Sequence, residues 1–123
     1  MARSVRRSPR QRLEDMRNAI SRAQRYVAGV SLDDYRYDDL RRDAVERCIE
    51  IISGASRHLT PGLLEVAPEM PWRAIRDIGN VLRHAYDGVD DEAIWRTATR
   101  DLIELERAVI AMIRLMERGD ADP

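Results

Sequence analysis

The chain has 123 residues, which is about the length of one domain and enough for a single hydrophobic core. Hydrophobic residues make up 44% and charged residues 35%, and the formal net charge of −1 excludes a globally basic nucleic-acid binder while leaving room for a local basic patch. All 21 basic residues are arginine, whose planar guanidinium suits carboxylate and phosphate groups.

Residues 1–9 are predicted to be a basic tail that precedes a helical domain over residues 10–118. No apolar segment follows the basic stretch, as a secretory signal requires, and no apolar run approaches the ~20 residues that span a bilayer. We therefore expect a cytoplasmic protein. Cys48, the only cysteine, excludes an internal disulfide and is predicted to be a small buried hydrophobe.

The first predicted helix opens at SPRQ, where Ser8 can cap it, Pro9 suits its first position and Gln11 completes a capping box. Apolar residues then recur every three or four positions until Gly29: Leu13, Met16, Ile20, Ala23 and Val27. The acidic and aromatic connection SLDDYRYDD is predicted to hold a short helical turn. Its acids would repel RNA, so it is either a solvated turn or a contact for a basic partner.

Three more helices are predicted, over residues 38–59, from Pro71-Trp72 to about Tyr86, and from Asp90 or Asp91 onward. Between the first two of these, TPGLLEVAPEMP carries three prolines and one glycine and is predicted to be a loop. No strand pattern is convincing. Amphipathic helices with short connections predict an all-α protein, an antiparallel four-helix bundle.

The segment RDIGNVLRHAYDG, residues 76–88, concentrates polar groups that the rest of the chain lacks. At 100° per residue, a polar stripe spans about 100° of the helix surface and comprises Arg76, Asn80, Arg83, His84 and Asp87. The opposite face is predicted to be the core face, with Ala74, Ile78, Val81, Leu82 and Ala85. From the residues alone, two interpretations of this stripe are equally favoured: a functional site and an ordinary solvent-exposed face.

The stretch EMPWRAIRDIGNVLRHAYDGVDDEAIW resembles the HepT-like proteins, minimal HEPN-type toxins of prokaryotes. Members show P-x-W opening a helix, then Asn, then H-x-Y, an acidic turn and a Trp in the next helix. The matching residues are Pro71, Trp72, Asn80, His84, Tyr86, Val89, Asp90 and Trp95. The segment DAVERCIEIISGAS resembles the family's A-V-x-R-x-L-E-I-I-G-E-A, so the resemblance spans about residues 10–118.

The resemblance implies a homodimer of helical bundles that cleaves RNA without a metal or other cofactor. It implies that His84 is the catalytic histidine, that Asn80 is its polar neighbour, and that a nucleotidyltransferase antitoxin silences the toxin by adenylylating Tyr86. Histidine can act as base or acid near neutral pH, and a guanidinium stabilises charge on the phosphate.

The chain departs from the family pattern in two places. Gly79 stands directly before Asn80, where the family usually has its Arg, and ISGA lacks the glutamate that often follows the glycine. Arg83 and Arg76 are the available substitutes, and Arg83 is favoured because it is next to His84 along the helix. The alternative is a non-catalytic helical protein that keeps the fold and binds a partner.

The remaining candidates are predicted to be structural. His58 is expected to interact with the last-turn carbonyls of its helix, and two histidines without ligand spacing do not make a metal site. Trp72 and Trp95 are expected to anchor the core rather than stack on bases.

Overall fold

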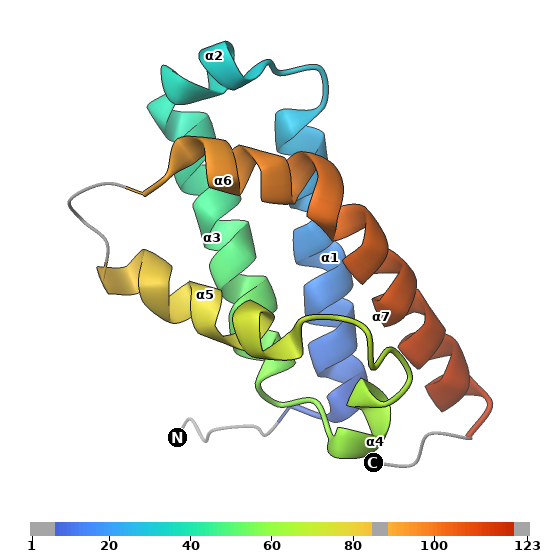
Figure 1. Ribbon diagram of the computed structural model, residues 1–123. Coiled ribbons are helices and arrows are strands. Elements are labelled where there is room, and N and C mark those ends of the chain that lie inside the picture. Colours follow the sequence, from blue (N-terminus) through green and yellow to red (C-terminus); the bar gives the residue numbers. More distant parts are fainter. Residues whose placement is uncertain (1–6, 85–88, 120–123) are drawn as a thin grey trace, which may run out of the picture.

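The computed structural model describes residues 7–84 and 89–119, and every regular element in these ranges is helical (Figure 1). The predicted all-α class is therefore confirmed. None of the described helices is long and apolar enough to cross a membrane.

The first helix, α1 (Pro9–Val27), begins as its sequence predicts. The Ser8 hydroxyl accepts from the Gln11 N–H at 3.1 Å, and the Gln11 side chain accepts from the Ser8 N–H at 2.8 Å. These two bonds satisfy backbone donors that the first turn otherwise leaves free. Gly29 follows the helix with a φ of 71°, a left-handed conformation that glycine adopts without strain.

The short helix α2 (Leu32–Arg36) confirms the helical turn predicted in the acidic connection, and it buries Tyr35. Helix α3 (Asp39–Ser56) follows, capped by the Asp38 side chain. It ends earlier than predicted, because Arg57 already serves as its C-cap. Its apolar side faces the core, and Cys48 is fully buried there, as predicted.

The segment predicted to be a loop contains one helical turn, α4 (Pro61–Leu64). The Thr60 hydroxyl caps it by accepting from the Leu63 N–H at 3.3 Å, and Leu63 is buried. The prediction was wrong here because Pro61 was counted as a helix breaker, whereas proline fits the first position of a helix.

Helix α5 (Trp72–His84) follows, and its first residue is an anchor. Trp72 is 7% exposed, and its indole N–H donates to the Ala67 carbonyl at 2.9 Å. Trp72 therefore has the core role that its sequence position predicts.

The last predicted helix is a succession of three segments: α6 (Asp91–Arg96), the π-helical η1 (Thr97–Asp101) and α7 (Leu102–Glu117). The Thr99 hydroxyl donates to the Trp95 carbonyl at 2.8 Å in the turn that leads into η1. Before this turn, the Trp95 indole donates to the Val30 carbonyl at 2.9 Å, which fixes α6 near α2.

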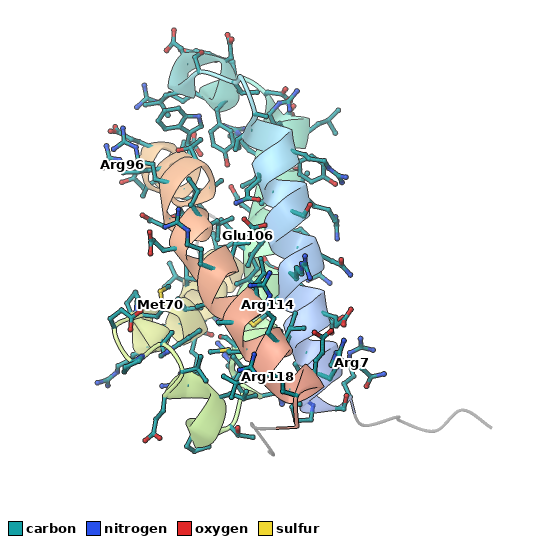
Figure 2. The ribbon with its side chains drawn as sticks, turned by 90° about the vertical axis from the view of Figure 1, so that its right-hand side faces the viewer. Arg7, Met70, Arg96, Glu106, Arg114 and Arg118 are labelled. Atoms are coloured by element: carbon teal, nitrogen blue, oxygen red, sulfur yellow. The ribbon has the colours of Figure 1, made fainter. Side chains whose placement is uncertain are left out.

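The long helices α1, α3 and α7 form the body of the molecule, with α1 in contact with both others. Figure 2 shows α1 and α7 side by side, with Arg7 and Arg118 at one end and Arg96 toward the other. Helix α5 packs mainly on α3 and runs across it in Figure 1. One side of α5 is therefore left at the surface.

Candidate functional site

The polar residues of α5 lie at the surface, as predicted. Asn80, Arg83 and His84 are exposed on its last two turns, and Arg76 is half-buried one turn earlier. The Arg83 Nη2 atom donates to the Asn80 Oδ1 atom at 3.4 Å, a long hydrogen bond that holds the guanidinium beside the amide. Tyr86 and Asp87 lie outside the described residues.

The predicted core face of α5 was right at two residues and wrong at two. Leu82 is buried and Ile78 packs against the core, whereas Val81 is 59% exposed and Ala74 is exposed. Ala85 lies outside the described residues. The reason is that α5 packs mainly on one neighbour, so only the narrow strip that faces α3 is covered. Its apolar residues beyond that strip remain at the surface.

Gly79 lies against Ser53, where α5 packs on α3. A Cβ atom on Gly79 would lie 2.7 Å from the Ser53 Oγ atom and 2.9 Å from the Ser53 Cβ atom. The Ser53 hydroxyl accepts from the Gly79 N–H at 3.0 Å and donates to the Arg76 carbonyl at 2.9 Å. Position 79 therefore faces α3, and a side chain there would collide with Ser53.

A second bond holds the middle of α5 against the end of α3. The Arg57 Nε atom donates to the Arg76 carbonyl at 3.0 Å. The carbonyl of Arg76 therefore accepts two side-chain hydrogen bonds, from Ser53 in α3 and from Arg57 at its C-cap. These bonds fix the position of α5 along α3. They thereby also fix the position of the polar side chains on the last two turns of α5.

Arg83 also lines a surface hollow that the sequence did not predict. This hollow of about 360 Å³, called here the arginine pocket, lies where α1, α3 and α5 meet. Its basic lining residues are Arg12, Arg47, His58 and Arg83, and its acidic ones are Asp15 and Glu50. Arg47, Gly54 and His58 are spaced by seven and four residues, so helical periodicity could have placed them on one side of α3.

His58 therefore has a different setting from the predicted one. It follows the Arg57 cap of α3, its side chain is exposed, and it shares the arginine pocket with Arg83. Its backbone N–H, rather than its ring, donates to the Ala55 carbonyl at 3.1 Å.

An apolar groove of about 430 Å³ lies on the other side of α5. Its walls come from α3, α5, η1 and α7, and they include Ile52, Met70, Ile78 and Leu105. Figure 2 shows Met70 on the segment before α5, on the side of α7 away from α1. Together with exposed Val81, the groove gives α5 an apolar border beside its polar residues.

The groups with the clearest pKa shifts belong to the interior around α2 and α3. Burial, with the nearby carboxylates of Glu46 and Asp91, raises the pKa of Tyr35 well above its usual range, and its hydroxyl has no hydrogen-bond partner among the described residues. Burial likewise raises the pKa of the Glu46 carboxyl and of the Cys48 thiol. Cys48 is therefore a packing residue rather than a nucleophile.

No group of three or more His, Cys, Asp and Glu side chains in ranges 7–84 and 89–119 is arranged to hold a metal ion. What the last turns of α5 offer is a cation, an amide and an imidazole at the surface. Such a set can bind a phosphate and move a proton.

Comparisons with known proteins agree with this chemistry. The family model described as Ribonuclease HepT-like matches residues 16–112. The chain is 32% identical over 102 residues to a probable ribonuclease HepT of Thermococcus cleftensis, a match that covers 83% of this chain and 93% of the relative. It is 34% identical over 83 residues to a candidate RNase of Caldanaerobacter subterraneus, covering 68% and 74% respectively. No solved structure gives a significant match.

Proposed function

Because the chain belongs to the HepT-like ribonuclease family, we propose that it is a metal-independent RNA endonuclease and the toxin of a toxin–antitoxin pair. The observation that carries the proposal is the pairing of Arg83 with Asn80 beside His84, all exposed at the end of α5. These are the residue types that the reaction requires.

RNA supplies its own nucleophile, the 2′-hydroxyl, once a base removes its proton. The 2′-oxygen attacks the neighbouring phosphorus, the bond from phosphorus to the 5′-oxygen breaks, and the leaving oxygen takes up a proton. His84 can be the base of the first transfer or the acid of the second. Arg83 binds the phosphate as its charge grows, and Asn80 orients the guanidinium or holds a phosphate oxygen.

Arg76 has a secondary part in this proposal. It lies about 12 Å of helical rise from His84, against about 1.5 Å for Arg83. Its carbonyl is bound by Ser53 and Arg57, and its side chain is half-buried. Arg76 therefore contacts RNA at a distance from the scissile phosphate.

We further propose that the active form is a homodimer. One copy of α5 presents few groups for the reaction, and its apolar border lies directly beside them. Covering Val81 and the apolar groove with a second copy would bury this border and bring two polar stripes together. The site would then hold twice the number of catalytic groups.

The proposed means of silencing is adenylylation of Tyr86 by a nucleotidyltransferase antitoxin. This step rests on the resemblance of the HAY segment to the family's H-x-Y, since Tyr86 lies outside the described residues. A phosphodiester on that tyrosine would add a negative charge two residues from His84, where RNA phosphate must bind.

A second candidate function is a non-catalytic helical protein that binds a partner. Gly79 favours it, because the position before Asn80 carries no guanidinium. The deciding experiment is incubation of the purified protein with single-stranded RNA in excess EDTA, followed by analysis of the products. New ends that carry a 2′,3′-cyclic phosphate support the nuclease, and intact RNA at high protein concentration supports the second candidate.

A further inference from the structure

We propose that the arginine pocket binds a phosphate of the RNA backbone next to the scissile one, which makes it a second subsite of the same nuclease. This inference rests on the proposed function, because the ligand is the RNA that the site at the end of α5 would cleave. Arg83 joins the two, since it lines the pocket and stands one residue before His84.

The charge balance of the pocket favours an anionic ligand. Both acids in its lining already have arginine partners: Asp15 is bound by Arg7 at 2.7 Å, and Glu50 by Arg47 at 3.2 Å. Among the described residues, Arg12, His58 and Arg83 form no ion pair. The hollow therefore has two guanidinium groups, those of Arg12 and Arg83, that no carboxylate in the described part of the chain neutralises.

Arg12 is the most informative of these residues. Its Nε atom is buried and has no hydrogen-bond acceptor in the described part of the chain. Burying this atom without an acceptor is unfavourable, so a structural role alone gives the residue little benefit. The buried Nε atom is itself out of reach of a ligand, but the Nη atoms of Arg12 form no hydrogen bond or ion pair among the described residues and can donate to a phosphate oxygen.

The pocket also has room for a phosphate group. Gly54 is part of its α3 wall, and a Cβ atom added there would meet no atom within 4 Å. The volume of about 360 Å³ exceeds the space of a single water molecule many times over. Consecutive phosphates of one RNA strand are separated by a single nucleotide. Because Arg83 lines the pocket and is next to His84, a strand whose scissile phosphate lies at His84 can place the adjacent phosphate in the pocket.

The test measures binding of a single-stranded, 2′-O-methylated RNA, which keeps its phosphates but lacks the attacking hydroxyl. Affinity is determined by fluorescence anisotropy over a range of salt concentrations. Arg12→Gln removes one cation, and Gly54→Gln fills the pocket without changing its charge. Arg17→Gln and Gly62→Gln are the matched controls, because Arg17 is exposed on α1 outside the pocket and Gly62 also has open space around a Cβ.

Arg12→Gln and Gly54→Gln should each weaken binding about tenfold. Each should also reduce the slope of log affinity against log salt by about 0.7, the value for one phosphate contact on a single strand. The controls should match the wild type. Equal affinities and slopes in pocket variants and controls would overturn the proposal. So would binding of inorganic phosphate alone that Arg12→Gln abolishes while RNA affinity stays the same.

Wild-type cleavage of unmodified RNA, measured in parallel, separates this inference from the nuclease proposal. Cleavage with no effect of the pocket variants on binding removes the subsite and keeps the nuclease. Binding that the pocket variants weaken, without cleavage, keeps the pocket as a site for an RNA phosphate and removes the nuclease. A wild-type protein that neither binds nor cleaves RNA removes both.

Discussion

The hydroxyl of Ser53 lies 3.0 Å from the backbone nitrogen of Gly79, so α3 and α5 touch where neither has a long side chain. This contact places the last two turns of α5, and with them Asn80, Arg83 and His84, at a set position over α3. It also shows why position 79 cannot simply be given the arginine that the family pattern suggests.

Gly79→Ala should lower the free energy of unfolding by about 1–3 kcal/mol, because its methyl group would overlap Ser53. The measurement is urea unfolding followed by circular dichroism. Gly54→Ala is the matched control, since its Cβ meets open space and should stabilise α3 by up to about 1 kcal/mol. In a Ser53→Gly background, Gly79→Ala should lower the free energy of unfolding by less than it does in the wild type. An equal loss of stability in both backgrounds would show that the two residues do not collide.

His84→Ala should lower the rate of RNA cleavage about 10²–10⁴-fold, the range for losing a general acid or base. The rate is measured in EDTA at saturating RNA, and circular dichroism verifies the fold. His84 is exposed, so its removal should leave stability nearly unchanged. A variant that is folded and fully active would assign the activity to other residues.

Arg83→Ala should abolish cleavage, whereas Arg76→Ala should only weaken it, because Arg83 is next to His84 and Arg76 is two turns away. Arg83→Lys should restore little activity, since an ammonium lacks the paired donors of a guanidinium. The measurement is the initial rate of cleavage of one RNA by each of the three variants, compared with the wild type. Greater damage from Arg76→Ala would mean that the phosphate is held across the dimer.

Light scattering at micromolar concentration should give about twice the chain mass of 14.2 kDa. Val81→Glu should shift the protein toward monomer, because it places a charge on the apolar border of α5. Leu40→Glu is the control, since Leu40 is an apolar residue at the start of α3 that is even more exposed than Val81, at 82%. A wild-type monomer at all concentrations contradicts the dimer.

A nucleotidyltransferase encoded beside this chain should transfer AMP from ATP to Tyr86, which intact-mass measurement would detect as one added nucleotide. Tyr86→Phe should prevent the gain in mass and leave cleavage resistant to the transferase. Tyr37→Phe should change neither, although Tyr37 is 86% exposed and therefore accessible. Modification of Tyr37 instead would remove Tyr86 from the proposal.

Short-range patterns in the sequence predicted where helices form, but not which faces of those helices pack against other helices. The capping box at Ser8 and Gln11 is a short-range pattern, and it appears in the structure. The face of α5 that is buried depends instead on how many helices pack on it. A helical wheel assumes that all apolar residues are covered, so it placed exposed Val81 in the core and gave no sign of the Ser53 contact.

The candidate site shows the same division. The exposed polar stripe followed from the spacing along one helix, and the structure places Asn80, Arg83 and His84 accordingly. The arginine pocket joins residues from α1, α3 and α5, which are as far apart in the chain as Arg12 and Arg83. No pattern within a single helix can reveal such a meeting.

The five residues of the π-helical turn, Thr97–Asp101, hold one residue more than the α-helix around them needs. The wider turn absorbs this residue, so the helices on either side keep the faces they would have in one regular helix. Trp95 can therefore reach the Val30 carbonyl while the apolar side of α7 faces α1. Deleting one residue of this turn should let α6 and α7 join as one regular helix with both contacts kept. A deletion in the regular part of α7 should instead turn the residues beyond it by about 100° and harm the fold.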